Sequence, residues 1–151
     1  MPDLSRMEFS DEIHDLTESK EVRAVPVPPA EGWVVGDPPV ILSKHLWLIT
    51  PENVLSALEN GPLGISTQRR RLAHTNLSGG RQAHCGGEMW FRDAESVWFT
   101  GASGRYPPRS QDELEYAAGC LRSAGYRVAC CGWDLETNTP ARMFREGIEW
   151  K

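Results

Sequence analysis

Residues 110–125 carry the signals that most restrict how this 151-residue chain can fold. Ser110 and Glu113 match the S-x-x-E capping box, which satisfies two free backbone N–H groups at the start of a helix. Gly125 is typical of a helix end. Between these signals, apolar residues recur at helical spacing: Leu114, Ala117, Ala118 and Leu121. The chain must therefore bury one stripe of a well-marked helix against another layer.

Strand-like segments lie on both sides of this helix. Residues 83–93 alternate between two faces, with Cys85, Met89 and Phe91 on one face and His84, Glu88 and Trp90 on the other. Residues 96–100, SVWFT, return after a tight turn near Asp93, and residues 126–134 follow the helix. We predict a β-hairpin, then the helix, then a further strand.

A second strand and helix are predicted upstream. Residues 44–50, KHLWLIT, read as a strand, while Thr50 and Pro51 are typical of a helix N-cap and first helical position. Apolar residues within 54–58 form a stripe, and Gly61 ends the element. The order β-α-β-β-α-β predicts an α+β fold with a small mixed or antiparallel sheet and two main helices packed on one face.

The first 32 residues differ from the rest in composition. Residues 1–23 hold seven acidic and three basic side chains, and a proline-rich stretch follows. Because few large apolar residues are present to offset the entropy of ordering, we predict a flexible arm over 1–32 and a single α+β domain over 33–151. Residues 9–16 can form a short helix, which suits docking on a protein partner.

Composition also restricts the class of protein. A net charge of −5 argues against broad nucleic-acid binding, although the sequence QRRR at 68–71 can form a local positive patch. No apolar run approaches the roughly 20 residues that span a bilayer. The four cysteines include no C-x-x-C pair and no secretory leader precedes them, so a cytoplasmic protein with reduced thiols is expected.

A metal site is not predicted from the sequence. The four histidines and four cysteines lack the ligand spacing of zinc sites. Cys85, Cys120 and Cys130 are interpreted instead as small buried packing residues. We expect no metal and no certain cofactor.

Three short stretches combine glycine with reactive side chains: AHTNLSGG at 73–80, CGGEMW at 85–90 and TGASGRY at 100–106. Glycine lets a backbone approach a ligand closely and turn its N–H groups outward. We predict that the stretches meet at one rim of the sheet. The proposed catalytic residues are Glu88, His74, Arg105 and Tyr106, and the proposed ligand-binding residues in these stretches are Thr75, Asn76, Ser103 and Gly104.

Two reactions suit this set of side chains. Glu88 or His74 can remove a proton from a ribose hydroxyl while Arg105 neutralises a phosphodiester, as in a metal-independent ribonuclease. Alternatively, the set can bind a dinucleotide, with Glu88 stabilising an oxocarbenium ion. Structural roles are open as well, since Glu88 and Arg105 can form an ion pair and His74 can be a hydrogen-bonded core residue.

The same three motifs, HTNLSGG, GGEMWF and SGRYPP, occur in order before the capped helix. Together they resemble a domain whose usual form is H-S-S-L-x-x-G, A-G-E and S-G-H-Y-x-P. That domain is found in bacterial polymorphic-toxin-like proteins and in plant IQ-motif calmodulin-binding proteins. The resemblance covers about residues 72–128, with these matching positions: His74, Thr75, Glu88, Ser103, Gly104, Tyr106 and Pro108.

This chain departs from the domain's pattern at one reactive position. Arg105 stands where the pattern usually has histidine, which disfavours a mechanism that needs a second histidine and favours anion binding. The chain has no IQ-type helix, so the plant function does not transfer. The family brings no settled reaction with it.

Residues 45–63 are similar to the opening strand and helix of ADP-ribosyltransferase-type folds. This likeness implies that His45 contacts NAD, with NAD as a substrate. The leading hypothesis is therefore a toxin-like enzyme acting on NAD or a nucleotide. The alternatives are a metal-independent ribonuclease and a non-catalytic protein-binding or immunity-type module that engages a partner through its acidic arm.

Overall fold

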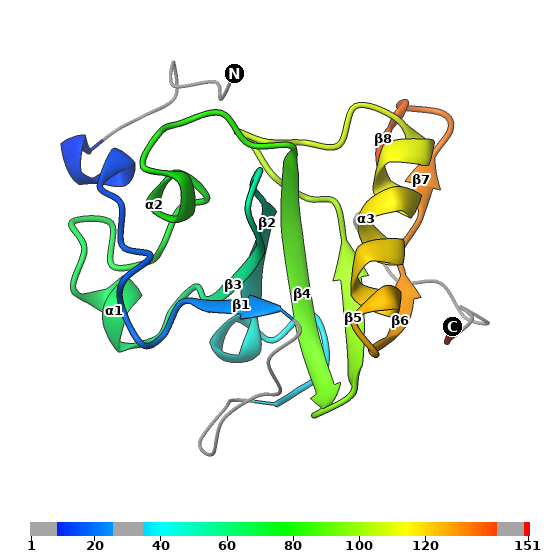
Figure 1. The fold of residues 1–151 in the computed structure, drawn as a ribbon, viewed down its shortest axis with the longest axis horizontal. Helices are drawn as coiled ribbons and strands as arrows, with labels where there is room; N and C mark the ends of the chain where they lie inside the picture. The colour runs from blue at the N-terminus through cyan, green and yellow to red at the C-terminus, as the bar shows by residue number, and fades with distance from the viewer. Residues whose placement is uncertain (1–8, 26–34, 142–149) are drawn as a thin grey trace.

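The computed structural model describes residues 9–25, 35–141 and 150–151, and Figure 1 shows their arrangement. A six-stranded sheet has the order β1-β3-β2-β4-β5-β6, in which only β5 and β6 run parallel. Its strands are β1 (Arg23–Val25), β2 (His45–Ile49), β3 (Val54–Leu58), β4 (Cys85–Asp93), β5 (Ser96–Thr100) and β6 (Arg127–Cys130). The mixed sheet confirms the predicted α+β class.

Short helices and a small second sheet complete the described structure. The α-helices are α1 (Pro62–Ile65), α2 (Thr75–Ser78) and α3 (Gln111–Ser123), and the 3-10 helices are η1 (Ser10–Ile13) and η2 (Ile41–Ser43). Strands β7 (Trp133–Asp134) and β8 (Thr139–Pro140) pair with each other. Among the described residues, none of the helices has the length and apolar character needed to traverse a lipid bilayer.

Helix α3 begins and ends where the sequence predicts. The Ser110 hydroxyl accepts a hydrogen bond from the Glu113 N–H at 3.1 Å, and Gly125 follows the helix with φ of +103°. The buried stripe of α3 packs on the face of β4 and β5 that carries Met89 and Phe99. The predicted hairpin of β4 and β5 is confirmed as well.

The opposite face of the sheet is also covered. Leu46 and Leu48 of β2 pack there against Leu72, Leu77 and Tyr106, which come from the segments around α2 and after β5. Figure 1 shows α1 and α2 on one side of the sheet and α3 on the other. The sheet is therefore buried on both faces, and α3 is the only helix of more than four residues in the described part of the chain.

The helix predicted after Thr50 is wrong, because this segment forms strand β3. The Thr50 N–H donates to the Asn53 carbonyl at 2.8 Å, and the Thr50 hydroxyl accepts from the Asn53 N–H at 3.1 Å. Threonine and proline suit the start of a tight turn as well as they suit a helix start. The chain turns back here, and β3 pairs with β2 and β1.

Part of the predicted flexible arm is packed on the domain. Residues 23–25 form edge strand β1 on β3, and η1 lies against α2 (Figure 1). The Leu16 N–H donates to the Asn76 carbonyl at 2.9 Å. The remainder of the arm, residues 1–8 and 26–32, lies outside the described residues.

Candidate functional site

A hollow of about 680 Å³ lies beside β4, and residues from all three glycine-containing stretches line it. His74 comes from the start of α2, Glu88 from β4, and Ser103, Gly104 and Arg105 from the loop after β5. Glu88 pairs with Thr100 in the sheet, so the loop that follows Thr100 begins next to this carboxylate. The hairpin register therefore brings two of the stretches together.

Glycines in β4 allow the stretch with His74 to lie close to this strand. A Cβ atom on Gly86 would lie 2.8 Å from Cδ2 of His74, and one on Gly87 would lie 2.0 Å from the Thr100 carbonyl oxygen. Both separations are shorter than van der Waals contact, so larger residues at 86 and 87 would displace His74 and part the hairpin. The CGGE sequence thus sets the position of the imidazole above the strand.

His74 and Ser103 form a hydrogen-bonded pair within the hollow. Nε2 of His74 lies 2.8 Å from the Gly87 carbonyl oxygen, which can only accept, so Nε2 carries the proton. Nδ1 then accepts from the Ser103 hydroxyl at 3.2 Å. Burial lowers the pKa of His74, which the bond to Gly87 only partly offsets, and the ring is neutral near pH 7. The imidazole fixes the serine hydroxyl in place.

Glu88 forms an ion pair with Lys44, and not the pair with Arg105 that the sequence left open as a structural alternative. The Lys44 Nζ lies 2.8 Å from Glu88 and 3.4 Å from Glu59. Burial lowers the pKa of Lys44, but these two carboxylates outweigh it, and the pKa lies above its ordinary value. The ammonium group is therefore charged, and the side chain of Glu88, which is 23% exposed, stays accessible from the hollow.

Arg105 pairs instead with Glu12 of the N-terminal segment. The Glu12 carboxylate is 2% exposed and lies 2.6 Å from Arg105 and 2.9 Å from Arg69. Thr75 and Asn76 hold this segment: the Thr75 hydroxyl donates to the Glu12 carbonyl, and the Asn76 amide donates to Asp11 and His14 carbonyls at 2.9 and 3.0 Å. Both predicted ligand-binding residues are thus buried in contacts with the chain itself.

Tyr106 is placed away from the hollow. Its hydroxyl donates to the Arg81 carbonyl at 2.7 Å and lies 2.5 Å from the Ser78 hydroxyl. Burial raises the pKa of Tyr106, and its ring belongs to the core cluster under α2. The geometry gives it a packing role in place of the catalytic role that the sequence suggested.

His45 also lies outside the lining of the hollow. It is buried on the other face of the sheet, where Nδ1 bonds the Ser43 carbonyl at 3.0 Å and the ring meets the edge of Phe91 at 4.9 Å. The NAD contact implied by the resemblance to ADP-ribosyltransferases does not fit this position. The burial of His45 instead predicts that the stability of the fold depends on pH.

Acidification should destabilise the protein through His45. Burial lowers the pKa of His45 from 6.5 to about 4, so the unfolded chain binds a proton more readily between these values. The stability that depends on neutral His45 is fully present above pH 6.5 and is lost as the pH falls toward 4. In urea unfolding, His45 alone should contribute a loss of about 2 kcal/mol between pH 7 and pH 5. His45→Gln should reduce that loss, and an equal loss in both proteins would contradict the assignment.

Several residues of the hollow were not predicted from the sequence. Four cations line it together with Glu59 and Glu88: Lys44, Arg69, Arg71 and Arg105. The QRRR stretch, with its potential for a local positive patch, carried the signal for Arg69 and Arg71, but the sequence did not connect it with the three glycine-containing stretches. Glu12 gave no signal, because one acid among many in an acidic segment does not reveal its partner.

Comparison with models of protein families, with curated proteins and with solved structures finds no match to this chain. The function must therefore be inferred from the chemistry of the hollow.

Proposed function

We propose that the hollow binds a phosphate-bearing nucleotide, with NAD as the first candidate, and that Glu88 is the catalytic carboxylate of a toxin-like, ADP-ribosyltransferase-like enzyme. The observation that supports this most is the combination of four cations with an accessible carboxylate in one hollow. Cations bind phosphate oxygens, and a carboxylate stabilises positive charge that develops on a ribose ring.

The phosphate groups would lie on the arginine side of the hollow. Nη2 of Arg105 pairs with Glu12, whereas its buried Nη1 has no hydrogen-bond partner within the described part of the chain. Arg71 lines the hollow and is exposed, so its guanidinium can also reach a ligand. Guanidinium groups match the geometry of phosphate oxygens, which favours a diphosphate here.

The ribose would then lie near Glu88. Cleavage of the bond between ribose C1′ and nicotinamide sends the bonding electrons to the leaving nicotinamide and leaves an oxocarbenium-like ribose. The Glu88 carboxylate stabilises that positive charge, and Lys44 holds the carboxylate in one orientation at 2.8 Å. Water or an acceptor side chain completes hydrolysis or transfer.

The arrangement around His74 favours this reaction over RNA cleavage. Both ring nitrogens are occupied, by Gly87 and by Ser103, and the ring is buried and neutral. A general acid or base must exchange protons with the substrate, which this imidazole does not reach directly. Its role is to position Ser103, whose hydroxyl can bond the ligand.

The described part of the N-terminal arm gives less support to the protein-binding alternative. Glu12 and Asp15 make their ion pairs with arginines of the same chain, and Asp11 accepts from the Gln68 N–H at 2.8 Å. A partner would have to compete with these contacts. The carboxylates of Asp11, Glu12 and Asp15 are already used within the fold.

Incubation of the protein with NAD tests the proposal directly. We expect release of nicotinamide together with free ADP-ribose or a modified acceptor. Chromatography measures the nicotinamide that is released. A parallel incubation with RNA in EDTA should leave the RNA intact. Cleavage of RNA to 2′,3′-cyclic ends without NAD turnover would instead establish the ribonuclease alternative.

A further inference from the structure

A second cavity, of about 1040 Å³, lies between the start of β4 and the first turn of α3. Its lining includes His84 and Glu113, with Arg109, Asp112 and Tyr116 around them. Cys85, which is fully buried, lies beside these two side chains. The nucleotide proposed above does not use His84, Cys85 or Glu113.

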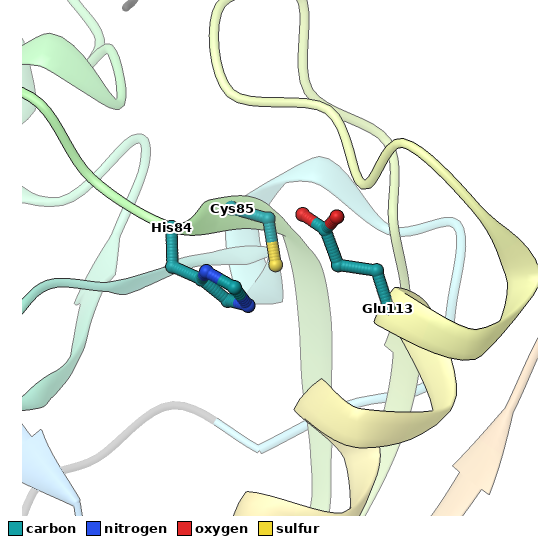
Figure 2. A group of neighbouring side chains, drawn as sticks. All are labelled: His84, Cys85 and Glu113. Carbon is teal, nitrogen blue, oxygen red and sulfur yellow. The ribbon is translucent and has the colours of Figure 1, made fainter.

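The three side chains converge on one point. Figure 2 shows the sulfur of Cys85 between the imidazole of His84 and the carboxylate of Glu113. One ligand atom from each residue lies within 4.8 Å of the other two. Consecutive residues of a strand point to opposite faces, but His84 precedes β4 and escapes this rule, so it can lie next to Cys85.

We propose that His84, Cys85 and Glu113 bind a divalent transition-metal ion of zinc's class, with the fourth coordination position open to the cavity. An imidazole, a thiolate and a carboxylate suit zinc and its neighbours, whereas calcium and magnesium prefer oxygen ligands alone. Metal–ligand bonds of about 2.0 to 2.3 Å require the ligand atoms to approach to roughly 3.5 Å. Rotation of the exposed His84 side chain can bring its imidazole closer to the other two ligand atoms.

The surroundings hold Glu113 ready for such an ion. Its backbone is fixed by the Ser110 cap, and Oε2 accepts from Arg109 at 3.1 Å. Oε1 is buried and has no hydrogen-bond partner in the part of the chain that the structure describes. A buried carboxylate oxygen without a partner is costly, and a metal ion would satisfy it. The backbone of His84 is anchored to the Ile49 carbonyl at 2.8 Å.

Three protein ligands with a fourth position facing solvent are typical of catalytic zinc sites, whereas structural sites close with four protein ligands. Water or a small anion would complete the coordination from the cavity. Arg109 and Arg105 line that cavity and favour an anionic ligand. The metal would therefore carry water or an anion; its three ligands lie outside the lining of the nucleotide hollow, and Arg105 lines both cavities.

Titration of the reduced, metal-free full chain with Zn²⁺ and with Co²⁺ tests the site. We expect one zinc ion per chain with micromolar or tighter affinity, and a higher melting temperature with zinc. Cobalt should give a thiolate charge-transfer band and intense visible bands of tetrahedral coordination. His84→Ala should weaken zinc binding at least about 10-fold. Cys85→Ser should remove the charge-transfer band.

His14→Gln is the matched control, because His14 is exposed and lies outside the cluster. It should bind zinc as the wild type does. Since Cys85 is buried and its variant can lose stability, the exposed His84 provides the independent measurement. Absence of stoichiometric zinc binding, a cobalt spectrum without the thiolate band, or unchanged affinity in His84→Ala would each overturn the proposal.

Discussion

Replacing Glu12 with alanine should lower the free energy of unfolding by about 3 to 5 kcal/mol. The Glu12 carboxylate is 2% exposed and pairs with Arg69 and Arg105, and the Arg105 side chain is only 10% exposed. Removal of the carboxylate leaves at least one guanidinium charge buried without its counter-ion. The same residue joins η1 to the loop after β5, so its loss also releases the N-terminal segment.

Urea unfolding monitored by tryptophan fluorescence measures this effect. Asp15→Asn is the matched control, because the Asp15–Arg81 pair spans 2.7 Å and its side chains are 34% and 72% exposed. That variant should lose less than about 1 kcal/mol. If Glu12→Ala were as stable as Asp15→Asn, the N-terminal ion pairs would not contribute to the fold as described.

Glu88→Gln should lower NAD turnover at least about 100-fold, because the amide cannot stabilise positive charge on the ribose. The fold should tolerate the change. Lys44 retains Glu59 at 3.4 Å, and glutamine keeps the volume of glutamate. Circular dichroism and thermal melting should therefore match the wild type, which separates lost chemistry from lost structure.

Glu59→Gln provides the comparison, since Glu59 contacts the same lysine. Its side chain is 9% exposed against 23% for Glu88, so it is the less accessible carboxylate. We expect turnover to fall much less in this variant than in Glu88→Gln. The reverse order would transfer the catalytic role to Glu59, and full activity in Glu88→Gln would refute the assignment.

Local signals in the sequence were sufficient for the elements that position the hollow. The Ser110 half of the predicted capping box and the two-residue alternation in 85–93 each depend on neighbouring residues alone. The hairpin register then follows from the short turn, and it places the loop after Thr100 next to Glu88. The approach of the loop with Ser103 and Arg105 to Glu88 was predictable for this reason, whereas the position of His74 depends on its close packing over Gly86.

The remaining errors concern contacts between distant parts of the chain. Thr50 and Pro51 suit a helix start and a turn equally, and only the pairing of β3 with β1 and β2 decides between them. The partner of Arg105 is 93 residues away, so no spacing rule could find Glu12. The proposed metal ligands are two adjacent residues at the start of β4 and a residue in the first turn of α3. This spacing matches no metal-site motif that could be recognised in the sequence.

Calorimetric titration with ADP-ribose tests most directly whether the hollow binds a phosphate-bearing nucleotide. We expect binding of one ligand per chain, weakened at least about 10-fold in Arg71→Gln because a charged contact to phosphate is lost. Arg127→Gln, an exposed change on β6 outside the hollow, should bind as the wild type does. Absence of binding to the wild type, or equal affinity in all three proteins, would contradict the account.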